Sequence, residues 1–225
     1  MKSELTFAVL LGGALTADAR VRSLTAGVRA IAADGGMAHA LTLSLDPELW
    51  VGDFDSAPAD LLVRYDNVPR MPFPAEKNFT DGELAIEQAI LRGATRLVLV
   101  GAFGGERTDH GLLHLLQAVS LAERGLDVML TSGEEEAYPL LPGVHTFNLP
   151  AGSLFSVLGL EPLIGLCLEG VKYPLDNADI GFGSSRTLSN IAGYESRVEA
   201  AGGVRVHLNS GRALLLARPH DFSGS

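Results

Sequence analysis

The chain has 225 residues, of which 47% are hydrophobic, and its formal net charge is −10. This length allows one large domain or two small ones, and the hydrophobic content is ample for a packed core. The acidic charge, without any basic run, argues against a nucleic-acid-binding protein, because such binding depends on Lys and Arg side chains that neutralise phosphates. No apolar stretch is long enough to span a bilayer.

The single cysteine, Cys167, excludes an internal disulfide and is typical of a protein from a reducing compartment. It lies in an apolar run, residues 163–168, so we expect a buried small hydrophobic residue and not a nucleophile. The N-terminus leads directly into a strand-like run, without the pattern of a signal peptide. We therefore expect a soluble, cytoplasmic protein that binds neither nucleic acid nor membrane.

The first half of the chain repeats a short apolar strand, a glycine-rich or acidic loop, and a helix. This alternation predicts an α/β domain with a mostly parallel sheet and helices on its faces. The expected strands are residues 5–11, 28–33, 49–52, 68–71, 96–100 and 126–130. The expected helices are residues 17–26, 37–43, 57–65 and 84–91, and a leucine-rich segment after residue 110.

The first two strands end in residues that suit a ligand site. The first ends at Gly12 and Gly13, where glycine lets the backbone approach a ligand closely. This pair alone is weak evidence, since glycine ends many strands for steric reasons. The second ends at Asp34 and Gly35, on the edge where open α/β sheets bind ligands. The alternative for Asp34 is a turn aspartate ahead of the next helix.

The third strand ends in Gly52-Asp53-Phe54-Asp55-Ser56. Asp53 and Asp55 project from one face of an extended strand end, and such a pair is costly unless a cation or hydrogen-bond donors lie between them. Mg²⁺ is the expected cation, because it takes oxygen ligands from carboxylates and substrate phosphates. The alternative is an Asp-rich turn in which Ser56 caps the following helix.

Two helix starts later in this half also carry polar residues. Thr80 and Glu83 have the spacing of a capping box. Asp81 falls in the first turn of that helix, where an acidic residue is favoured by the helix dipole and can also face a metal–phosphate group. The alternative is that Asp81 only stabilises the start of this helix and binds no ligand.

The segment after the strand 96–100 is rich in glycine and leads into Arg107, Asp109 and His110. Glycine turns at a helix N-terminus present backbone N–H groups to an anion, and Arg107 adds a forked donor suited to phosphate. The alternative is a flexible loop with a capping residue and a surface or core histidine. Taken together, the carboxylates expected at this edge of the sheet predict a metal–nucleotide site with Arg107. They are Asp34, Asp53, Asp55, Asp81 and Asp109.

The second half of the chain consists of short apolar runs between turns with Pro or Gly, which predicts a β-sandwich. We place the boundary between residues 132 and 133. The three glutamates at 134–136 are expected to be solvated. The expected strands are residues 136–140, 144–149, 154–158, 164–168, 171–174, 197–201, 204–208 and 213–217.

Two segments of the second half have residues that suit a flat ligand. Tyr173 offers an aromatic face for stacking, and the loop 183–190, which contains Ser189 and Asn190, is rich in hydroxyl and amide groups. The alternative is a core tyrosine and ordinary turn residues.

These motifs together resemble the thiamine pyrophosphokinase family, in the family's order and over nearly the whole chain. They are Ala33-Asp34-Gly35-Gly36, Gly52-Asp53-Phe54-Asp55-Ser56, Thr80-Asp81 with Glu83, Gly104 to His110, Lys172-Tyr173-Pro174-Leu175, and Ser189-Asn190. The resemblance implies a Rossmann-like, three-layer α/β domain that binds ATP over residues 1–132. It also implies a β-sandwich that binds thiamine and dimerises over residues 133–225.

The activity implied by the resemblance is transfer of a diphosphate group from ATP to the hydroxyethyl oxygen of thiamine, giving thiamine diphosphate and AMP. The family is homodimeric, with thiamine bound where the subunits meet. Mg²⁺ is the implied cofactor, and ATP and thiamine are the implied substrates.

The resemblance also assigns roles to matching positions. Asp53, Asp55 and Asp81 would hold Mg²⁺, Arg107 would contact the ATP phosphates, and Asp109 would orient or deprotonate the hydroxyl, with Asp81 as the alternative. Tyr173 would stack on the thiamine pyrimidine, with Ser189 and Asn190 hydrogen-bonding that ring. The remaining residues of the implied ATP site are Gly12, Gly13, Asp34, Gly35, Asn78, Thr80 and His110.

Three positions depart from the family pattern. Asn78 stands where the family has Asp, Glu106 intervenes between Gly105 and Arg107, and His114 stands where the family has Asn. These departures keep two alternatives open. One is an ATP- and thiamine-binding homologue with impaired catalysis, and the other is a diphosphokinase for a different hydroxylated acceptor.

Overall fold

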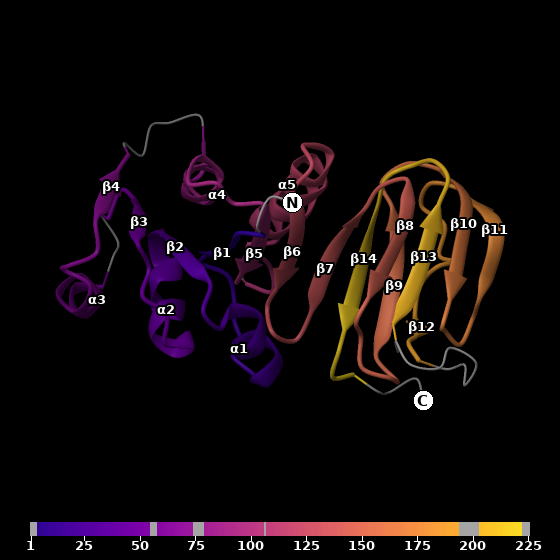
Figure 1. Cartoon of the computed structure of the whole chain (residues 1–225), viewed down its shortest axis with the longest axis horizontal. Coiled ribbons are helices and arrows are strands. Elements are labelled where there is room, and N and C mark those ends of the chain that lie inside the picture. Colours follow the sequence, from indigo (N-terminus) through magenta and orange to yellow (C-terminus); the bar gives the residue numbers. More distant parts are fainter. Residues whose placement is uncertain (1–3, 55–57, 74–78, 106, 194–202, 222–225) are drawn as a thin grey trace. The chain divides into compact units, whose positions relative to one another are not determined.

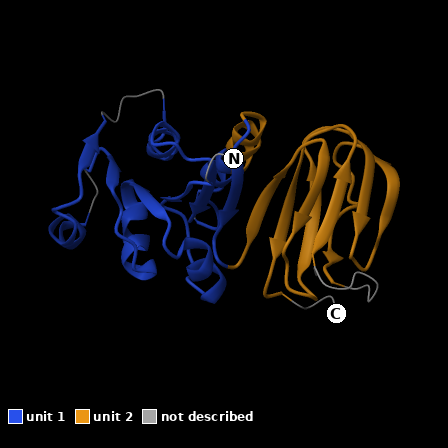
Figure 2. Cartoon of the chain, in the orientation of Figure 1, with its two compact units in different colours: residues 1–114, 125–133 blue, residues 115–124, 134–225 orange. Residues whose placement is uncertain are grey.

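A computed structural model describes residues 4–54, 58–73, 79–105, 107–193 and 203–221. The chain divides into two compact units, residues 1–114 with 125–133 and residues 115–124 with 134–225 (Figure 2). The ATP-binding role of residues 1–132 stays a prediction, as do the thiamine-binding and dimerisation roles of residues 133–225.

The first unit alternates strands and helices along the chain (Figure 1). Its strands are β1 (Thr6–Leu10), β2 (Arg29–Ala33), β3 (Leu49–Gly52), β4 (Arg70–Pro72), β5 (Arg96–Val100) and β6 (Asp127–Thr131). Its helices are α1 (Ala19–Thr25), the 3₁₀ turn η1 (Asp34–Gly36), α2 (Met37–Leu43), α3 (Ala59–Arg64), α4 (Asp81–Leu91) and the start of α5 (Thr108–Glu123). None of the helices in the described ranges has the length and hydrophobicity needed to cross a membrane.

The six strands of this unit form a parallel sheet in the order β6-β5-β1-β2-β3-β4. Helices α1 and α2 lie on one side of the sheet, and α4 and the start of α5 lie on the other (Figure 1). The strand order reverses between β1 and β5. Such a reversal opens a crevice outside the carboxyl ends of the strands, where α/β proteins bind ligands. The predicted three-layer α/β fold is confirmed.

The inner strands are buried on both faces, which explains their continuous apolar runs. Every residue of β3 is buried, as is every residue after the first in β1, β2, β5 and β6. Helices on both sides of a parallel sheet leave no solvent-facing side for polar residues. The continuous apolar runs in the sequence therefore predict these strands correctly.

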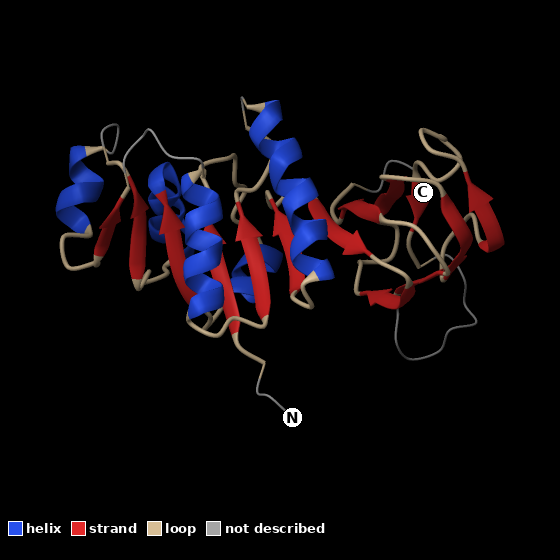
Figure 3. Ribbon diagram, turned by 90° about the horizontal axis from the view of Figure 1, so that it is seen from above, coloured by secondary structure: helices blue, strands red, loops and turns tan. Residues whose placement is uncertain are grey.

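The strands of the second unit, labelled in Figure 1 and red in Figure 3, form two antiparallel sheets. One contains β12 (Asn190–Ile191), β9 (Leu154–Gly159), β14 (Ala213–Arg218) and β7 (Glu136–Leu140), and the other contains β11 (Leu175–Ile180), β10 (Leu163–Glu169), β13 (Val204–Leu208) and β8 (Gly143–Phe147). Buried side chains from both sheets, such as Val157 and Leu215 from one and Leu166 and Val206 from the other, share one hydrophobic core. This packing confirms the predicted β-sandwich.

The strand expected at residues 171–174 is wrong. Val171 makes only an isolated bridge to Ala192, and strand β11 follows at Leu175–Ile180. Gly170 turns the chain with a φ of +72°, and Pro174 has no N–H to donate to a ladder. Strand β11 was missed because its Asp and Asn side chains are rare in strands; here they lie exposed at a sheet edge. The expected strand 197–201 lies outside the described residues.

Two further expectations need correction. Glu136 is only 1% exposed, and its Oε2 accepts a hydrogen bond of 2.6 Å from the Tyr138 hydroxyl, so only the first two of the three glutamates are solvated. Cys167 is half-buried and not a core residue. Its Sγ accepts a hydrogen bond of 3.3 Å from the backbone N–H of Asn177.

Gly36 offers a test of how closely η1 packs on β1. A Cβ atom on Gly36 would overlap the carbonyl oxygen of Leu10, whereas a Cβ atom on Gly35 would have no atom within 4 Å. We expect Gly36→Ala to lower the free energy of unfolding by about 1–3 kcal/mol, the usual cost of overpacking. The matched variant Gly35→Ala should change it by less than about 1 kcal/mol. Urea unfolding checks both values, and equal stabilities of the two variants would contradict this packing.

Candidate functional site

The turn after β1 packs directly against the turn after β5. The N–H of Leu11 donates to the carbonyl of Val100 at 2.8 Å, and the N–H of Gly13 donates to the carbonyl of Gly101 at 2.9 Å. A Cβ atom on Gly13 would overlap that carbonyl, and Gly101 has a φ of +68°, which glycine adopts without strain. These glycines allow the two turns to meet where the strand order reverses.

His39 of α2 holds the same turn. Its Nε2 lies 2.9 Å from the carbonyl oxygen of Gly13, and Nε2 must carry the proton because a carbonyl oxygen only accepts. Burial lowers the pKa of His39 below its ordinary value, although hydrogen bonds to the backbone of Gly13 and Leu11 partly oppose this effect. No sequence signal identified His39, since a single histidine on a short helix has no distinctive spacing.

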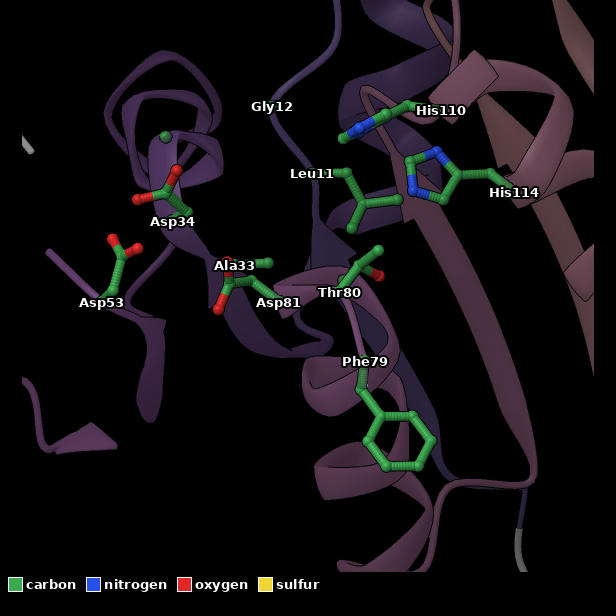
Figure 4. Close-up of a pocket in the computed structure, with 12 residues that line it drawn as sticks. Leu11, Gly12, Ala33, Asp34, Asp53, Phe79, Thr80, Asp81, His110 and His114 are labelled. Carbon is green, nitrogen blue, oxygen red and sulfur yellow. The ribbon is translucent and has the colours of Figure 1, made fainter. Parts of the chain in front are cut away.

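Asp34 is held in an unusual conformation at the end of β2. Its φ is +43°, in the left-handed region, and the indole N–H of Trp50 donates to its carbonyl oxygen at 2.9 Å. A Cβ atom on Gly52 would contact the Cα of Asp34 at 3.4 Å, so the end of β3 lies directly beside it. The carboxylates of Asp34 and Asp53 point toward each other (Figure 4).

The backbone around Asp53 is fixed by its neighbours. Gly52 accepts a hydrogen bond of 3.1 Å from the N–H of Phe73. Phe54 has a φ of +62° and packs edge-on against the ring of Trp50, with ring centroids 5.1 Å apart. These contacts direct the chain out of β3 so that Asp53 faces the sheet edge. Its predicted partner Asp55, like Ser56, lies outside the described residues.

The predicted capping box at the start of α4 is confirmed. Thr80 Oγ1 accepts from the N–H of Glu83 at 3.1 Å, and Glu83 Oε2 accepts from the N–H of Thr80 at 2.8 Å. This reciprocal pair fixes the first turn of the helix, and Asp81 is its first residue. Asn78, the position at which the family pattern departs, lies outside the described residues.

Arg107 and Asp109 form a two-point ion pair at the start of α5. Nε and Nη2 of Arg107 donate to the two carboxylate oxygens of Asp109 at 2.9 and 2.7 Å. These hydrogen bonds lower the pKa of Asp109 far below its ordinary value and raise that of Arg107. With both oxygens engaged, Asp109 is a weak proton acceptor in this arrangement, which disfavours the deprotonating role that the sequence suggested. Glu106 lies outside the described residues.

His114 is buried two helical turns into α5. Its side chain is 8% exposed, and its Nδ1 lies 2.6 Å from the carbonyl oxygen of Ala102. The ring of His110 meets it edge-on, with centroids 6.4 Å apart. Burial is the main cause that lowers the pKa of His114; the charge of His110 adds to the effect, whereas the bond to Ala102 and the charge of Glu83 oppose it.

Two cavities open at this edge of the first unit. One, of about 420 Å³, is lined by carboxylates, and the other, of about 470 Å³, is lined by glycine turns and Arg107. Gly12, His110 and His114 line both. The structure thus brings most of the predicted residues of this half together, and Figure 4 shows those of the first cavity. The first cavity adds Asp34, Gly35, Asp53, Thr80 and Asp81, and the second adds Gly13, Gly101, Gly105 and Arg107.

The carboxylate cavity suits a magnesium ion shared with a substrate. Across the described ranges, no three His, Cys, Asp or Glu side chains are close enough to hold a metal ion by themselves. Mg²⁺ is usually bound through only one or two carboxylates, with waters and substrate phosphates completing its shell. Asp53 and Asp81 on the wall of one cavity fit that requirement.

A second group of predicted residues lies in the second unit. The side chain of Asn190 is 4% exposed and binds the backbone of Tyr173, accepting from its N–H at 3.0 Å and donating to its carbonyl at 2.8 Å. The amide oxygen of Asn190 also accepts from Ile191 N–H at 2.9 Å. The amide of Asn190 thus holds the Tyr173 backbone, and its predicted hydrogen bond to a ring stays a prediction.

The side chain of Tyr173 is largely exposed. The residue is 57% exposed, and Lys172 Nζ lies 5.8 Å from the centre of its ring. Ser189, next to Asn190 in the sequence, is exposed and has a φ of +56°. Its backbone N–H donates to Ser156 Oγ at 3.0 Å, which fixes the turn that carries its hydroxyl.

Comparison with known proteins gives matches over both halves of the chain. Residues 24–130 match the family model described as thiamin pyrophosphokinase, catalytic domain. Residues 144–209 match the model described as thiamin pyrophosphokinase, vitamin B1 binding domain. The chain is also 27% identical over 164 residues to thiamine pyrophosphokinase of Bacillus subtilis strain 168, an alignment that covers 71% of this chain and 76% of that protein.

Solved structures show the same fold over nearly the full length. The crystal structure of thiamine pyrophosphokinase from Bacillus subtilis has a TM-score of 0.81 and 22% identity, and the match covers 96% of this chain and 99% of that one. The enzyme from Geobacillus thermodenitrificans gives 0.79 and 27%, with 97% and 99% covered. The one from Candida albicans gives 0.76 and 17%, with 95% and 90% covered.

Proposed function

The chain belongs to the thiamin pyrophosphokinase family, and on that premise we propose that it transfers a diphosphate group from ATP to thiamine, giving thiamine diphosphate and AMP. The family predicted from the sequence motifs is thereby confirmed. The main support is the position of two neighbouring cavities, one lined by carboxylates and the other by glycines and an arginine. They share three residues where the strand order of the parallel sheet reverses.

We propose that the glycine-lined cavity receives the phosphates of ATP. Glycine turns leave backbone N–H groups accessible to anions, and the start of α5 adds the positive end of a helix dipole. Arg107 lines this cavity, and its guanidinium, which now binds both oxygens of Asp109, offers the same forked geometry to a phosphate. Phosphate binding therefore exchanges one anionic partner of Arg107 for another.

We propose that Asp53 and Asp81 hold Mg²⁺, with Asp34 beside them in the same cavity. Asp55 would complete this set from outside the described residues. When bound, Mg²⁺ neutralises phosphate oxygens and makes the phosphorus easier to attack. Trp50 and the capping box of Thr80 keep the carboxylate-bearing turns in place, so the chain itself supplies the preorganisation that such a site needs.

The proposed reaction is an in-line displacement. The hydroxyl oxygen of thiamine forms a bond to the β-phosphorus of ATP, the bond from that phosphorus to the oxygen of the α-phosphate breaks, and AMP leaves. Enzymes of this kind act mainly by holding the reactants in line and by stabilising negative charge. Arg107 meets the second need as charge moves onto the leaving oxygen.

We propose that Tyr173 stacks on the pyrimidine ring of thiamine and that Ser189 hydrogen-bonds it. The support is the exposed ring of Tyr173, together with the clamp by which Asn190 holds the Tyr173 backbone. In this scheme Asn190 is a positioning residue.

We also propose that the enzyme is cytoplasmic. The support is the single cysteine of the chain, which excludes an internal disulfide.

The first experiment incubates the purified protein with ATP, Mg²⁺ and thiamine and measures both products. We expect thiamine diphosphate and AMP in equal amounts. Asp53→Ala should lower kcat at least about 100-fold, because it removes a charge that stabilises the transferring group. The matched variant Asp66→Ala changes an exposed aspartate outside both cavities and should retain the wild-type rate.

Each alternative has its own outcome in this experiment. Binding of ATP and thiamine without either product would favour the homologue with impaired catalysis. AMP formation with only another hydroxylated acceptor would favour a different diphosphokinase. Near-wild-type turnover of Asp53→Ala would contradict the proposed metal site.

Tyr173 can be tested through the Michaelis constants of the two substrates. Tyr173→Ala should raise the KM for thiamine about 10-fold, since stacking on an aromatic ring contributes about 1–3 kcal/mol, and should leave the KM for ATP unchanged. Tyr173→Phe keeps the ring and serves as the control. An equal KM for thiamine in Tyr173→Ala and the wild type would rule out the stacking role.

We propose that the protein is a homodimer. The support is a set of large apolar side chains exposed on the second unit, which a partner subunit would cover; they are Val144, Ile164, Phe182 and Leu188, exposed by 56, 46, 72 and 45%. Sedimentation equilibrium should give twice the chain mass of 23.7 kDa. A monomer mass at all protein concentrations that support activity would argue against the dimer.

A further inference from the structure

His39 contacts the turn that lines the glycine-lined cavity, and not the cavity itself. It comes from α2, on the face of the sheet opposite α4 and α5 (Figure 1). It is not among the described residues that line either cavity. Its Nε2 donates at 2.9 Å to the carbonyl of Gly13, which does line the glycine-lined cavity. His39 can therefore act on that cavity only through the turn after β1.

The ring of His39 lies where the turn after β1 meets the turn after β5. A Cβ atom on Gly101 would lie 2.8 Å from Nε2 and 3.0 Å from Cδ2 of His39, so the ring packs directly on the backbone of Gly101. The N–H of Gly13 donates to the carbonyl of Gly101 at 2.9 Å. Gly13 is thus held at both ends, at its N–H by Gly101 and at its carbonyl by His39.

The direction of the Gly13 carbonyl matters to an anion in the cavity. Anion sites in proteins present backbone N–H groups, whereas a carbonyl oxygen carries partial negative charge and would repel a phosphate. Gly12 lines both cavities, and within the described part of the chain its N–H donates no hydrogen bond. This N–H can serve a phosphate best when the neighbouring carbonyl is held elsewhere.

His39 supplies a hydrogen bond without supplying a charge. Burial lowers its pKa below the ordinary value of 6.5, so the ring is neutral near pH 7. Its Nε2 still carries the proton, because the carbonyl of Gly13 only accepts. The positive charge at this cavity comes from Arg107, which lines it. Arg107 can therefore attract the phosphates, while His39 fixes the backbone that meets them.

We propose that His39 is a positioning residue for the phosphates of ATP. Its Nε2–H holds the carbonyl of Gly13 away from the phosphates, so that the turn after β1 meets them with N–H groups. This inference rests on the proposed function, which places the ATP phosphates in the glycine-lined cavity, and adds to it a residue outside that cavity. Thiamine is assigned to Tyr173 in the second unit, so His39 should affect the affinity for ATP and not the KM for thiamine.

The test measures the dissociation constants of ATP and of inorganic tripolyphosphate, both with Mg²⁺, by isothermal titration calorimetry. Tripolyphosphate has the phosphates without the nucleoside. His39→Leu keeps a side chain of moderate size but has no donor, and it should weaken binding of both ligands about 10-fold, as loss of one hydrogen bond can. The KM for thiamine should stay unchanged.

Two further variants serve as controls. His39→Gln has an amide nitrogen that can reach the same carbonyl, and both dissociation constants should stay within about threefold of the wild type. His145→Leu removes another histidine that hydrogen-bonds a carbonyl, that of Leu141 at 2.8 Å, but in the second unit. It should bind both ligands as the wild type does.

Three results would overturn the role of His39. They are wild-type affinities in His39→Leu, equal weakening in His39→Leu and His39→Gln, and weaker binding of ATP with unchanged binding of tripolyphosphate. The second would mean that the ring only fills space, and the third that it acts on the nucleoside. A dissociation constant does not depend on the amount of folded protein. If His39→Leu does not fold, His39→Asn, whose shorter amide cannot reach Gly13, takes its place in the comparison with His39→Gln.

Failure of the proposed function would give a different result. A wild type that binds tripolyphosphate but forms no thiamine diphosphate would overturn the proposed function and leave the role of His39 in phosphate binding intact. A wild type that binds neither ATP nor tripolyphosphate would overturn both.

Discussion

The site depends on backbone segments that approach each other more closely than side chains allow. The turn after β1 lies against the turn after β5, and η1 lies against the last residue of β1; in each case a Cβ atom on the glycine, Gly13 or Gly36, would overlap a carbonyl oxygen. Glycine is the residue that permits such contact. Because these approaches occur where the strand order reverses, they bring the glycine-lined and carboxylate-lined cavities together along shared residues.

Several of the turns that carry functional groups are held in place by contacts within the protein. Trp50 binds the carbonyl of Asp34, His39 binds that of Gly13, and Thr80 with Glu83 fixes the turn that carries Asp81. Dipoles and charges that are already oriented need no reorganisation when charge develops in a reaction. The same logic holds in the second unit, where Asn190 supports Tyr173.

Local patterns in the sequence predicted the parts of this molecule that depend on local causes. Apolar runs located the buried strands, and Thr80 with Glu83 located the start of α4, because burial and capping act within a few residues. Strand β11 was not predicted from the sequence, because its polar residues lie at a sheet edge. A strand was wrongly predicted at residues 171–174, because the turn at Gly170 and the missing N–H of Pro174 outweigh the apolar residues there. The supporting roles of His39, Asn190 and His114 depend on hydrogen bonds between residues distant in sequence, or on burial, which no local pattern encodes.

The ion pair of Arg107 and Asp109 links phosphate binding to the choice of proton acceptor. Both side chains are about two-thirds exposed, and an exposed pair contributes little stability, so a phosphate can displace Asp109 from Arg107 at low cost. The displaced carboxylate would then lie beside phosphate oxygens, whose negative charge raises its pKa and makes it a better proton acceptor. Phosphate binding at this edge would therefore turn Asp109 from a weak base into a stronger one.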